Sequence, residues 1–286
     1  MAQATKESVQ EEKTKLLESE AENLEEILGE ADEEFDEFGE EGDSPAQDDG
    51  PFGLWSADLA EKKGLKVLLY GASGAGKTRM CATFPKPLFL DLESGLRTTF
   101  QVKPVLRYPA NPKEEVESLE QVKEFYSLVK KTKNPTFETI VVDSLNELQV
   151  LVTRNVIGKF KEANRQYEDQ MTQADYGKAN RDFLSIIRLF LKLPYHIVFT
   201  AVETPREYPE QQVYPKFVGK QIGPDLQRIM EMIGYCHVVR GKDGTSQHFV
   251  SFKMSPTYIA KDRMGIVEKD IPNDFKYLEQ YMNPER

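Results

Sequence analysis

Residues 64–78 read Gly-Leu-Lys-Val-Leu-Leu-Tyr-Gly-Ala-Ser-Gly-Ala-Gly-Lys-Thr, and this stretch decides the fold. Its first half is a short apolar run that ends in glycine, which is typical of a buried parallel strand. Its second half holds glycines at 71, 74 and 76 and opens a helix over 77–84, which Pro85 and Pro87 stop. The sequence therefore predicts a strand, a tight glycine loop and a helix in succession.

The loop has the residue types that hold a triphosphate. Glycines let the backbone curl until successive N–H groups face phosphate oxygens, and the following helix adds the positive end of its dipole. Lys77 is expected to reach the β- and γ-phosphates, and Thr78 to offer its hydroxyl to Mg²⁺. The predicted nucleotide-binding residues are Gly71, Ala72, Ser73, Gly74, Ala75, Gly76, Lys77 and Thr78.

Two further strand ends supply carboxylates. Asp143 closes the apolar run 139–143 and is the predicted second Mg²⁺ ligand, although an aspartate there can also cap the next helix. Asp91 and Glu93 stand at the end of the strand 88–91, and either could activate a water molecule beside the γ-phosphate. Because the carboxyl ends of parallel strands line one crevice, these groups are expected to meet at the loop.

Strands and helices alternate through the chain body. Strands are expected at 64–70, 88–91, 105–108, 139–143 and 196–201, and helices at 77–84, 113–131, 144–157 and 176–193. This alternation predicts an α/β fold with a mostly parallel sheet flanked by helices. The stretches 235–240, 247–253 and 257–260 look like hairpin-connected strands, so the sheet should end in an antiparallel extension.

Charge divides the chain into two parts. Residues 1–50 hold 19 Asp/Glu and 3 Lys/Arg, a net −16, and because the whole chain carries −11 the remaining 236 residues carry +5. The interpretation is an acidic, mostly disordered arm over 1–52 and one folded domain over 53–286. The arm could be a solvated tail, or it could dock a single-strand-binding or replication protein.

Composition excludes several classes of protein. The two cysteines, Cys81 and Cys236, do not have the spacing of a zinc site or a disulfide framework. No apolar run approaches the roughly 20 residues of a membrane span, and no signal peptide is evident. A cytoplasmic protein is expected. The three histidines, His196, His237 and His248, are scattered, so packing roles are favoured over metal binding.

Together, the glycine loop, Phe-Leu-Asp-Leu-Glu at 89–93, the strand ending in Asp143 and the strand ending near Ala201 resemble the core of RecA-type recombinase ATPases. Over about 64–265 the chain also resembles the short phage-encoded RecA-like ATPases of recombination and single-strand annealing, which share the Pro-Leu-Phe-Leu-Asp-Leu-Glu run at 87–93 and a late Ala-Lys-Asp-Arg at 260–263. The resemblance implies a RecA-like fold, ATP and Mg²⁺ as cofactors, and the host cytoplasm as compartment if the chain is phage-encoded. It also assigns the general base to Glu93.

The resemblance extends to a late basic pair. RecA-type filaments place a Lys-x-Lys pair against the γ-phosphate held by a neighbouring subunit, which falls on Lys261 and Arg263 here and implies a homo-oligomer, ring or filament. The alternative is an exposed charged turn. The sequence departs from the family after the strand 196–201, where no Gln or His sensor stands. Thr200, Glu203 or Thr204 could take that role.

The segment 203–224 is too long for an idle connection and too rich in Pro and Gly for a helix. It interleaves cations with aromatic rings, which suits phosphates and bases of a single strand. The predicted DNA-binding residues are Arg206, Lys216, Phe217 and Lys220, with Lys159 and Lys161 in a second basic stretch. Alternatively the rings pack on the body, and Lys220 could serve the phosphate site.

The residues therefore predict an ATPase that acts on single-stranded DNA in recombination, annealing or replication, with turnover stimulated by DNA. Two alternatives stay open. One is a helicase or packaging-type motor without strand exchange. The other is a nucleotide-gated scaffold with little turnover, whose acidic arm recruits another protein.

Overall fold

The computed structural model describes residues 64–96, 103–162, 171–204, 212–241 and 244–282, without the side chains of 159–162 and 282. The chain divides into two units, Met1–Trp55 and Ser56–Arg286, and every described residue belongs to the second. The predicted arm over 1–52 therefore lies outside the described residues.

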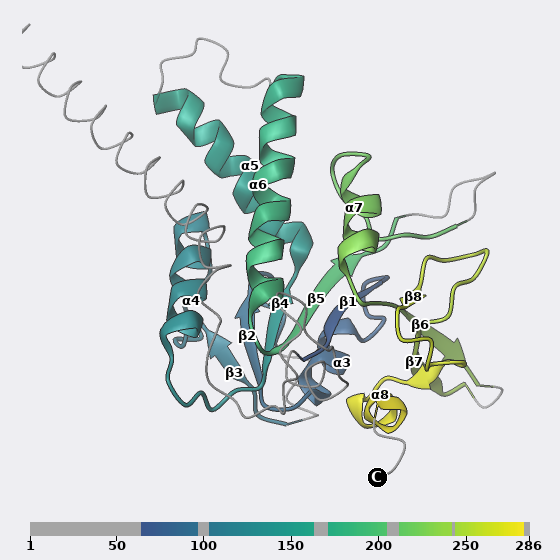
Figure 1. Ribbon diagram of the computed structural model, residues 1–286. Helices are drawn as coiled ribbons and strands as arrows, with labels where there is room; N and C mark the ends of the chain where they lie inside the picture. Colours follow the sequence, from purple (N-terminus) through teal and green to yellow (C-terminus); the bar gives the residue numbers. More distant parts are fainter. Residues whose placement is uncertain (1–63, 97–102, 163–170, 205–211, 242–243, 283–286) are drawn as a thin grey trace, which may run out of the picture. The chain divides into compact units, whose positions relative to one another are not determined.

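Nine strands in the described part of the chain form one sheet, in the order β3-β2-β4-β5-β1-β6-β7-β9 with β8 paired to β6 (Figure 1). The strands are β1 (Lys66–Gly71), β2 (Pro87–Asp91), β3 (Leu106–Tyr108), β4 (Thr139–Asp143), β5 (His196–Val202), β6 (Met232–Arg240), β7 (Ser246–Ser251), β8 (Lys261–Asp262) and β9 (Ile271–Pro272). The run from β3 to β6 is parallel, whereas β7, β8 and β9 pair antiparallel. This confirms the predicted mostly parallel sheet with an antiparallel C-terminal extension.

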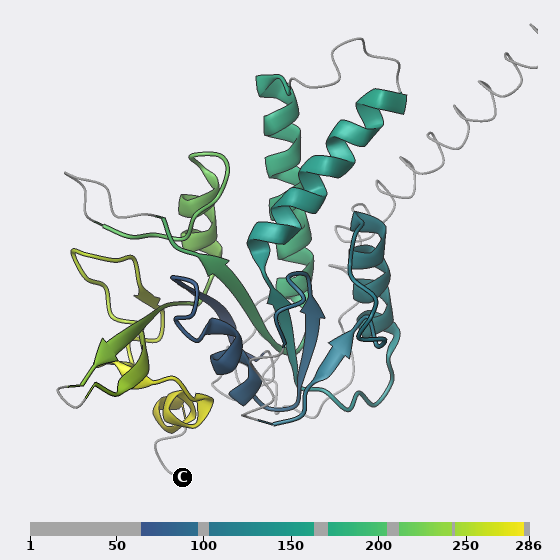
Figure 2. The same ribbon diagram turned by 180° about the vertical axis from the view of Figure 1, so that it is seen from behind.

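Six helices of the described chain cover the sheet. They are α3 (Lys77–Thr83), α4 (Leu119–Lys131), α5 (Leu145–Glu162), α6 (Gln173–Lys192), α7 (Ile222–Ile229) and α8 (Phe275–Met282). The two opposite views show α4, α5 and α6 beside the parallel strands, with α3 and α8 together near the antiparallel end (Figures 1 and 2).

Each face of the sheet has its own hydrophobic core. Strand side chains alternate between faces, so Leu68 and Tyr70 of β1 join the core under α4, α5, α6 and α7. Val67 and Leu69 join the second core, under α3 and α8. All six β1 residues are buried. The strand that leads into the glycine loop is therefore fixed from both sides.

Two helices begin later or earlier than predicted because of their caps. Helix α4 starts at Leu119 rather than 113, since the Ser118 hydroxyl accepts from the Gln121 N–H and Gln121 returns a bond to the Ser118 N–H. Helix α6 starts at Gln173 rather than 176, because Thr172 and Asp175 form the same reciprocal capping box. These side-chain bonds outweigh the apolar spacing used to predict the ends.

The predicted strand over 257–260 is wrong. Tyr258 forms only isolated bridges, with Val213 and Ser255, and the strand that extends β6 is β8 at 261–262. Helices α7 and α8 were not predicted. Helix α7 starts at Ile222 with Pro224 in its first turn, where a missing N–H costs no helical bond.

None of the helices in the described ranges combines the length and the apolar character that crossing a bilayer requires.

Candidate nucleotide site

The glycine loop joins the carboxyl end of β1 to the start of α3. Gly74 and Gly76 have φ of 78° and 94°, a left-handed conformation that favours glycine. At Gly71 a Cβ atom would lie 2.3 Å from the Cys236 carbonyl oxygen, so the neighbouring strand β6 also requires glycine there. The Ala75 N–H donates to the Ala72 carbonyl (3.1 Å) and closes the turn.

Lys77, the first residue of α3, folds back over the loop. Its Nζ donates to the carbonyls of Gly71 (3.0 Å) and Ala72 (2.9 Å). The ammonium group therefore lies across the loop that is predicted to hold phosphate. A triphosphate there would exchange these neutral acceptors for charged oxygens, which make stronger hydrogen bonds.

Asp143 lies at the end of β4 and is 2% exposed. Its Oδ2 accepts from the Thr78 hydroxyl (2.7 Å), and its Oδ1 accepts from the Thr200 hydroxyl. Burial raises the pKa of this carboxyl, against the two hydroxyl bonds, and the nearby Glu93 and Asp91 raise it further.

The donor set around Asp143 suits Mg²⁺. Two hard oxygen ligands, the Thr78 hydroxyl and the Asp143 carboxylate, lie within one hydrogen bond of each other, and Mg²⁺ sites near phosphates commonly use one or two such groups. A divalent cation would also offset the burial cost of the carboxylate. No cluster of three or more His, Cys, Asp or Glu side chains suited to a metal occurs among the described residues.

Asp91 and Glu93, the two candidates for the general base, have different environments. Asp91 is 2% exposed and pairs with the Arg107 guanidinium (Nε to Oδ2, 3.0 Å). Its other oxygen accepts from the Gly95 N–H (3.1 Å). Glu93 is exposed and accepts from the hydroxyl of Ser144, the residue after Asp143. Asp91 is thus engaged in structural contacts, and Glu93 is the carboxylate available at the strand ends.

Arg107 explains why Asp91 is held so firmly. Its two terminal nitrogens donate to the carbonyls of Pro109 (3.1 Å), Asn111 (2.9 Å) and Glu114 (3.0 Å). One guanidinium therefore ties Asp91 to the loop that precedes α4. The planar guanidinium, with its several donors, can bond the carboxylate and these carbonyls at the same time.

The three possible sensor residues occupy different positions. Thr200 is buried and contacts Asp143 directly, which makes it the one nearest the metal ligands. Thr204 exchanges hydrogen bonds with Tyr214 of the 212–221 loop. Glu203 bridges to Pro215 of the same loop. Its Oε2 is buried without a hydrogen-bond partner among the described residues.

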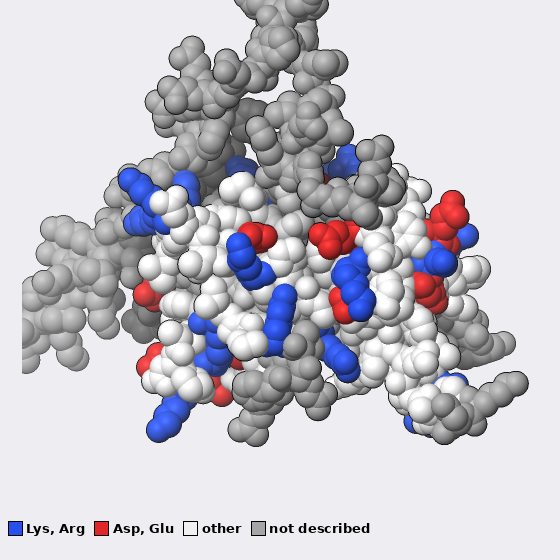
Figure 3. All heavy atoms as spheres, turned by 90° about the horizontal axis from the view of Figure 1, so that it is seen from below, with Lys and Arg blue, Asp and Glu red and all other residues white. Residues whose placement is uncertain are grey.

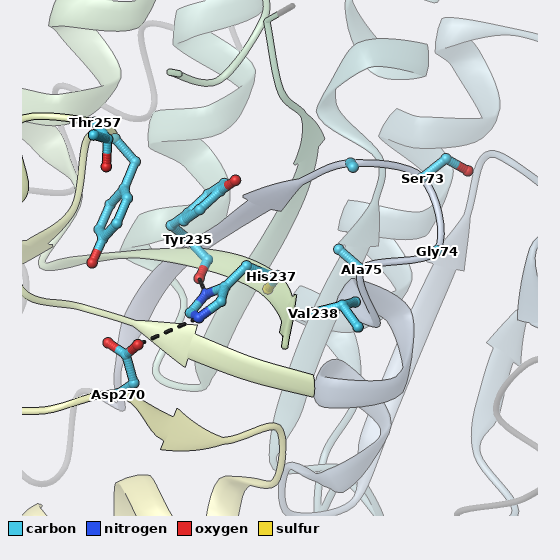
Figure 4. A pocket seen from close by; sticks show the side chains of 11 residues that line it. Ser73, Gly74, Ala75, Tyr235, His237, Val238, Thr257 and Asp270 are labelled. Carbon is cyan, nitrogen blue, oxygen red and sulfur yellow. Dashed lines mark hydrogen bonds and ion pairs between the residues drawn. The ribbon is translucent and has the colours of Figure 1, made fainter. Parts of the chain in front are cut away.

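A cavity of about 420 Å³ opens beside the glycine loop, on the side of β6. Residues 72–75 form one wall, and Figure 4 shows Tyr235, His237 and Asp270 side by side on the other. The Tyr235 ring stacks on Tyr258 (4.7 Å between centroids) and on His237 (5.6 Å). His237 Nε2 also pairs with Asp270 (3.3 Å). The wall opposite the loop is therefore aromatic.

The late basic pair lies at the other end of the strands. Asp262 of β8 pairs with Met232, which pairs with Val67, four residues before Gly71; at 3.3 Å per residue this separation is roughly 13 Å. Lys261 Nζ donates to the carbonyls of Gln227 and Met230 (2.7 Å each) at the end of α7. Arg263 is exposed. Lys261 therefore has a structural role, and its action in trans stays a prediction.

The predicted DNA residues are not equivalent. Lys216 and Lys220 are exposed, whereas Phe217 packs against Phe183 (5.9 Å between centroids) and belongs with the core. Arg206 lies outside the described residues. Lys159 and Lys161 lie on the last turns of α5, and only their backbone is described.

Several contacting residues were missed from the sequence. No sequence motif marks them, and a serine, tyrosine or histidine in such a segment is usually explained by packing. They are Ser144, Tyr235, Tyr258 and His248. His248 in particular contacts the loop, with Nδ1 3.1 Å from the Ala75 carbonyl. Only the spacing of strand ends could have indicated Ser144.

A search of curated proteins found no match to this chain. Residues 63–264 match the family model described as an AAA domain. This match spans more than half of the chain, includes the glycine loop, Glu93, Asp143 and Thr200, and supports nucleotide binding and hydrolysis. The chain belongs to the AAA domain family.

Proposed function

We propose that the chain is a Mg²⁺-dependent ATPase in which Glu93 is the general base, and that its turnover is coupled to single-stranded DNA. The observation that carries the ATPase is the short path of contacts from Thr78 through Asp143 and Ser144 to Glu93. The glycine loop, the proposed Mg²⁺ ligands and the exposed Glu93 carboxylate all lie at the carboxyl-terminal ends of the parallel strands. These are the parts that phosphoryl transfer to water needs.

In the proposed reaction Glu93 orients a water molecule and accepts its proton as the oxygen attacks the γ-phosphorus. The bond from that phosphorus to the β,γ-bridging oxygen breaks, which gives ADP and inorganic phosphate. Lys77 and the N–H groups of the loop neutralise charge on the phosphate oxygens. Ser144 holds Glu93 in place through its hydroxyl.

Thr78 and Asp143 are the proposed ligands of Mg²⁺, which supplies charge neutralisation at the phosphates when bound. Thr200 fixes the second carboxylate oxygen, so that Asp143 presents one oxygen beside Thr78. The adenine ring is proposed to lie in the cavity against Tyr258, because a flat base stacks well on a flat ring and Tyr235 is already covered by Tyr258 and His237.

Asp143→Asn is expected to raise the unfolding temperature measured without Mg²⁺ while lowering turnover about 10²-fold, the scale of losing one preorganised electrostatic group. Burial holds the folded pKa of Asp143 above 3.8, so ionisation costs stability. That cost appears as pH rises from the unfolded pKa through the folded pKa, and the amide removes it. Thermal melts at pH 4 to 8 with a Mg²⁺ titration of turnover measure both effects. A variant that melts lower at pH 7 and keeps its Mg²⁺ dependence would contradict the assignment.

The coupling to DNA is proposed to run through residues 212–221. The Asn146 amide donates to the Lys216 carbonyl (2.7 Å), and its oxygen accepts from the Val202 N–H (2.8 Å). Gln149 exchanges two bonds with Val218 (2.8 and 2.9 Å). Both amide side chains lie in the first turns of α5, directly after Asp143 and Ser144. A shift at the metal ligands would therefore reach Lys216 through side-chain contacts.

The charge distribution is compatible with this location. Figure 3 shows the face at the amino-terminal ends of the parallel strands, where the Lys and Arg side chains that are drawn lie scattered among carboxylates and uncharged residues. The described residues of that face form no continuous basic stripe, whereas nucleic-acid sites concentrate cations. The exposed Lys216 and Lys220 lie in the loop at the opposite, carboxyl-terminal ends.

The double variant Lys216→Glu, Lys220→Glu is expected to lose most of the stimulation of ATP turnover by single-stranded DNA and to keep its turnover without DNA. Each lost phosphate contact also reduces the salt dependence of binding, by a slope of about 0.7 per contact. The matched control is Lys131→Glu, Lys133→Glu, an equal charge change on exposed residues at the end of α4 and beyond. Lys77→Ala serves as the inactive reference.

The same measurements separate the alternatives. Turnover that rises with DNA and is lost in Lys77→Ala supports an ATPase of recombination, annealing or replication. Binding of ATP without turnover supports the nucleotide-gated scaffold, and displacement of an annealed strand during turnover supports a motor. Turnover that ignores DNA in the wild type contradicts the coupling to DNA and leaves the ATPase.

A further inference from the structure

The carbonyl side of the glycine loop is held by two side chains from the C-terminal part of the chain. Asn273 Nδ2 donates to the Gly76 carbonyl (2.8 Å), and His248 Nδ1 lies 3.1 Å from the Ala75 carbonyl. We infer that His248 and Asn273 are positioning residues that aim the Gly76 and Lys77 N–H groups at phosphate. This inference rests on the proposed binding of a nucleotide at the loop.

The argument follows from the planarity of the peptide bond. In a trans peptide the carbonyl of one residue and the N–H of the next point in opposite directions within one rigid plane. Holding the Ala75 oxygen therefore sets the direction of the Gly76 N–H, and holding the Gly76 oxygen sets that of the Lys77 N–H. Both N–H groups then point away from His248 and Asn273, toward the open side of the loop.

Glycine makes this control necessary. Gly76 stands at the N-cap of α3 with φ of 94°, and no side chain caps the helix there. Glycines at 74 and 76 leave the peptide planes between them free to rotate, whereas the plane after Gly76 is also held by the bond from the Met80 N–H to the Gly76 carbonyl (2.9 Å). The two side chains lie directly against this residue, since a Cβ on Gly76 would meet Asn273 Nδ2 at 2.6 Å and His248 Nδ1 at 3.1 Å.

The cost of keeping Asn273 supports a role beyond packing. Its Oδ1 is buried and has no hydrogen-bond partner among the described residues. An unsatisfied buried acceptor costs stability, of the order of 1–3 kcal/mol in proteins generally. An apolar side chain of similar size would avoid that cost, so the bond from Nδ2 to Gly76 is the contact that requires asparagine.

The segment around Asn273 is anchored at both ends of α3. The Asn273 N–H donates to the His248 carbonyl (3.1 Å), which joins the two positioning residues. The Phe275 N–H donates to the Thr83 hydroxyl (2.8 Å), and the Phe275 ring packs on Phe84 (4.4 Å between centroids). This segment lies beyond residues 63–264 of the AAA domain match. The chain thus adds a support to the loop from outside the matched region.

The test is binding of Mg²⁺·ADP by isothermal titration calorimetry, together with thermal unfolding. Asn273→Leu removes the donor and the unsatisfied oxygen and keeps the same branching and number of heavy atoms, so we expect an unchanged or higher unfolding temperature and about tenfold weaker binding, equivalent to about 1.4 kcal/mol. Asn273→Asp keeps the shape without a donor and should weaken binding at least as much. A merely structural asparagine would not separate stability from affinity in this way.

His248 offers a conservative rescue. The amide nitrogen of an asparagine can occupy the position of Nδ1, so the affinity of His248→Asn for Mg²⁺·ADP should stay within about threefold of the wild type. His248→Leu should bind about tenfold more weakly, which corresponds to about 1.4 kcal/mol. If the wild type binds Mg²⁺·ADP and the folded variants Asn273→Leu, Asn273→Asp and His248→Leu bind it equally well, the positioning role is overturned and the nucleotide site stands. A wild type that does not bind Mg²⁺·ADP overturns the nucleotide site and the inference with it.

Discussion

Glu93→Gln is expected to lower the rate of ATP hydrolysis by about 10³-fold, within the 10² to 10⁴ range of a general base, and to keep ATP binding. Glutamine preserves the size of the side chain and the oxygen that accepts from the Ser144 hydroxyl. It removes only the ability to take a proton from water. Single-turnover hydrolysis and equilibrium binding of Mg²⁺·ATP measure the two effects separately.

Glu115→Gln is the matched control for this change. Glu115 is also an exposed carboxylate that accepts from a serine hydroxyl, Ser94 (2.9 Å), close to the strand end that carries Glu93. Its turnover should stay within about twofold of the wild type, since it is not assigned to proton transfer. A Glu93→Gln enzyme that also keeps such turnover would remove Glu93 from the mechanism. Asp91 is not expected to replace Glu93 as the general base, because its carboxylate forms an ion pair with Arg107.

Arg263→Ala is expected to lower turnover by about 10³-fold if Arg263 acts on the phosphate of a neighbouring copy, the scale of a cation supplied in trans. Arg263 is exposed and lies at the far end of β1 from its own loop, so within one chain it has no route to the γ-phosphate. Lys261 is less available, because the carbonyls of Gln227 and Met230 hold its ammonium group.

A mixing experiment distinguishes action in trans from a local effect. Lys77→Ala supplies an intact Arg263, and Arg263→Ala supplies an intact glycine loop, so mixing two inactive variants should restore part of the activity. Wild-type turnover per chain should also rise with protein concentration. Arg188→Ala, at an exposed arginine on α6, is the control and should stay active. Failure of the mixture to exceed its separate components would count against the shared site.

The sequence specified most of the local structure. An apolar run ending in glycine predicted β1, and the glycine spacing with Lys77 and Thr78 predicted the loop and α3, because these are contacts between chain neighbours. The alternation of strand and helix patterns predicted the parallel sheet, and the hairpin-like strands near the C-terminus predicted its antiparallel end, since the spacing of apolar residues shows which face of each segment is buried. Asp143 was correctly predicted at the carboxyl-terminal ends of the strands, beside the glycine loop, because these ends of parallel strands line one crevice. The ends of α4 and α6 were less accurate, since single side-chain bonds set them.

Only the tertiary structure decided which of several similar residues lie at the site. Two carboxylates stand at the end of β2, and the Arg107 guanidinium, 16 residues after Asp91, engages Asp91 and leaves Glu93 exposed. Thr200, one of three possible sensors, is the one whose hydroxyl contacts Asp143. His248 and Asn273, 173 and 197 residues from the carbonyls they hold, carry no motif at all. Local patterns encode backbone conformation, whereas the pairing of distant side chains depends on the strand order and register that the folded sheet imposes.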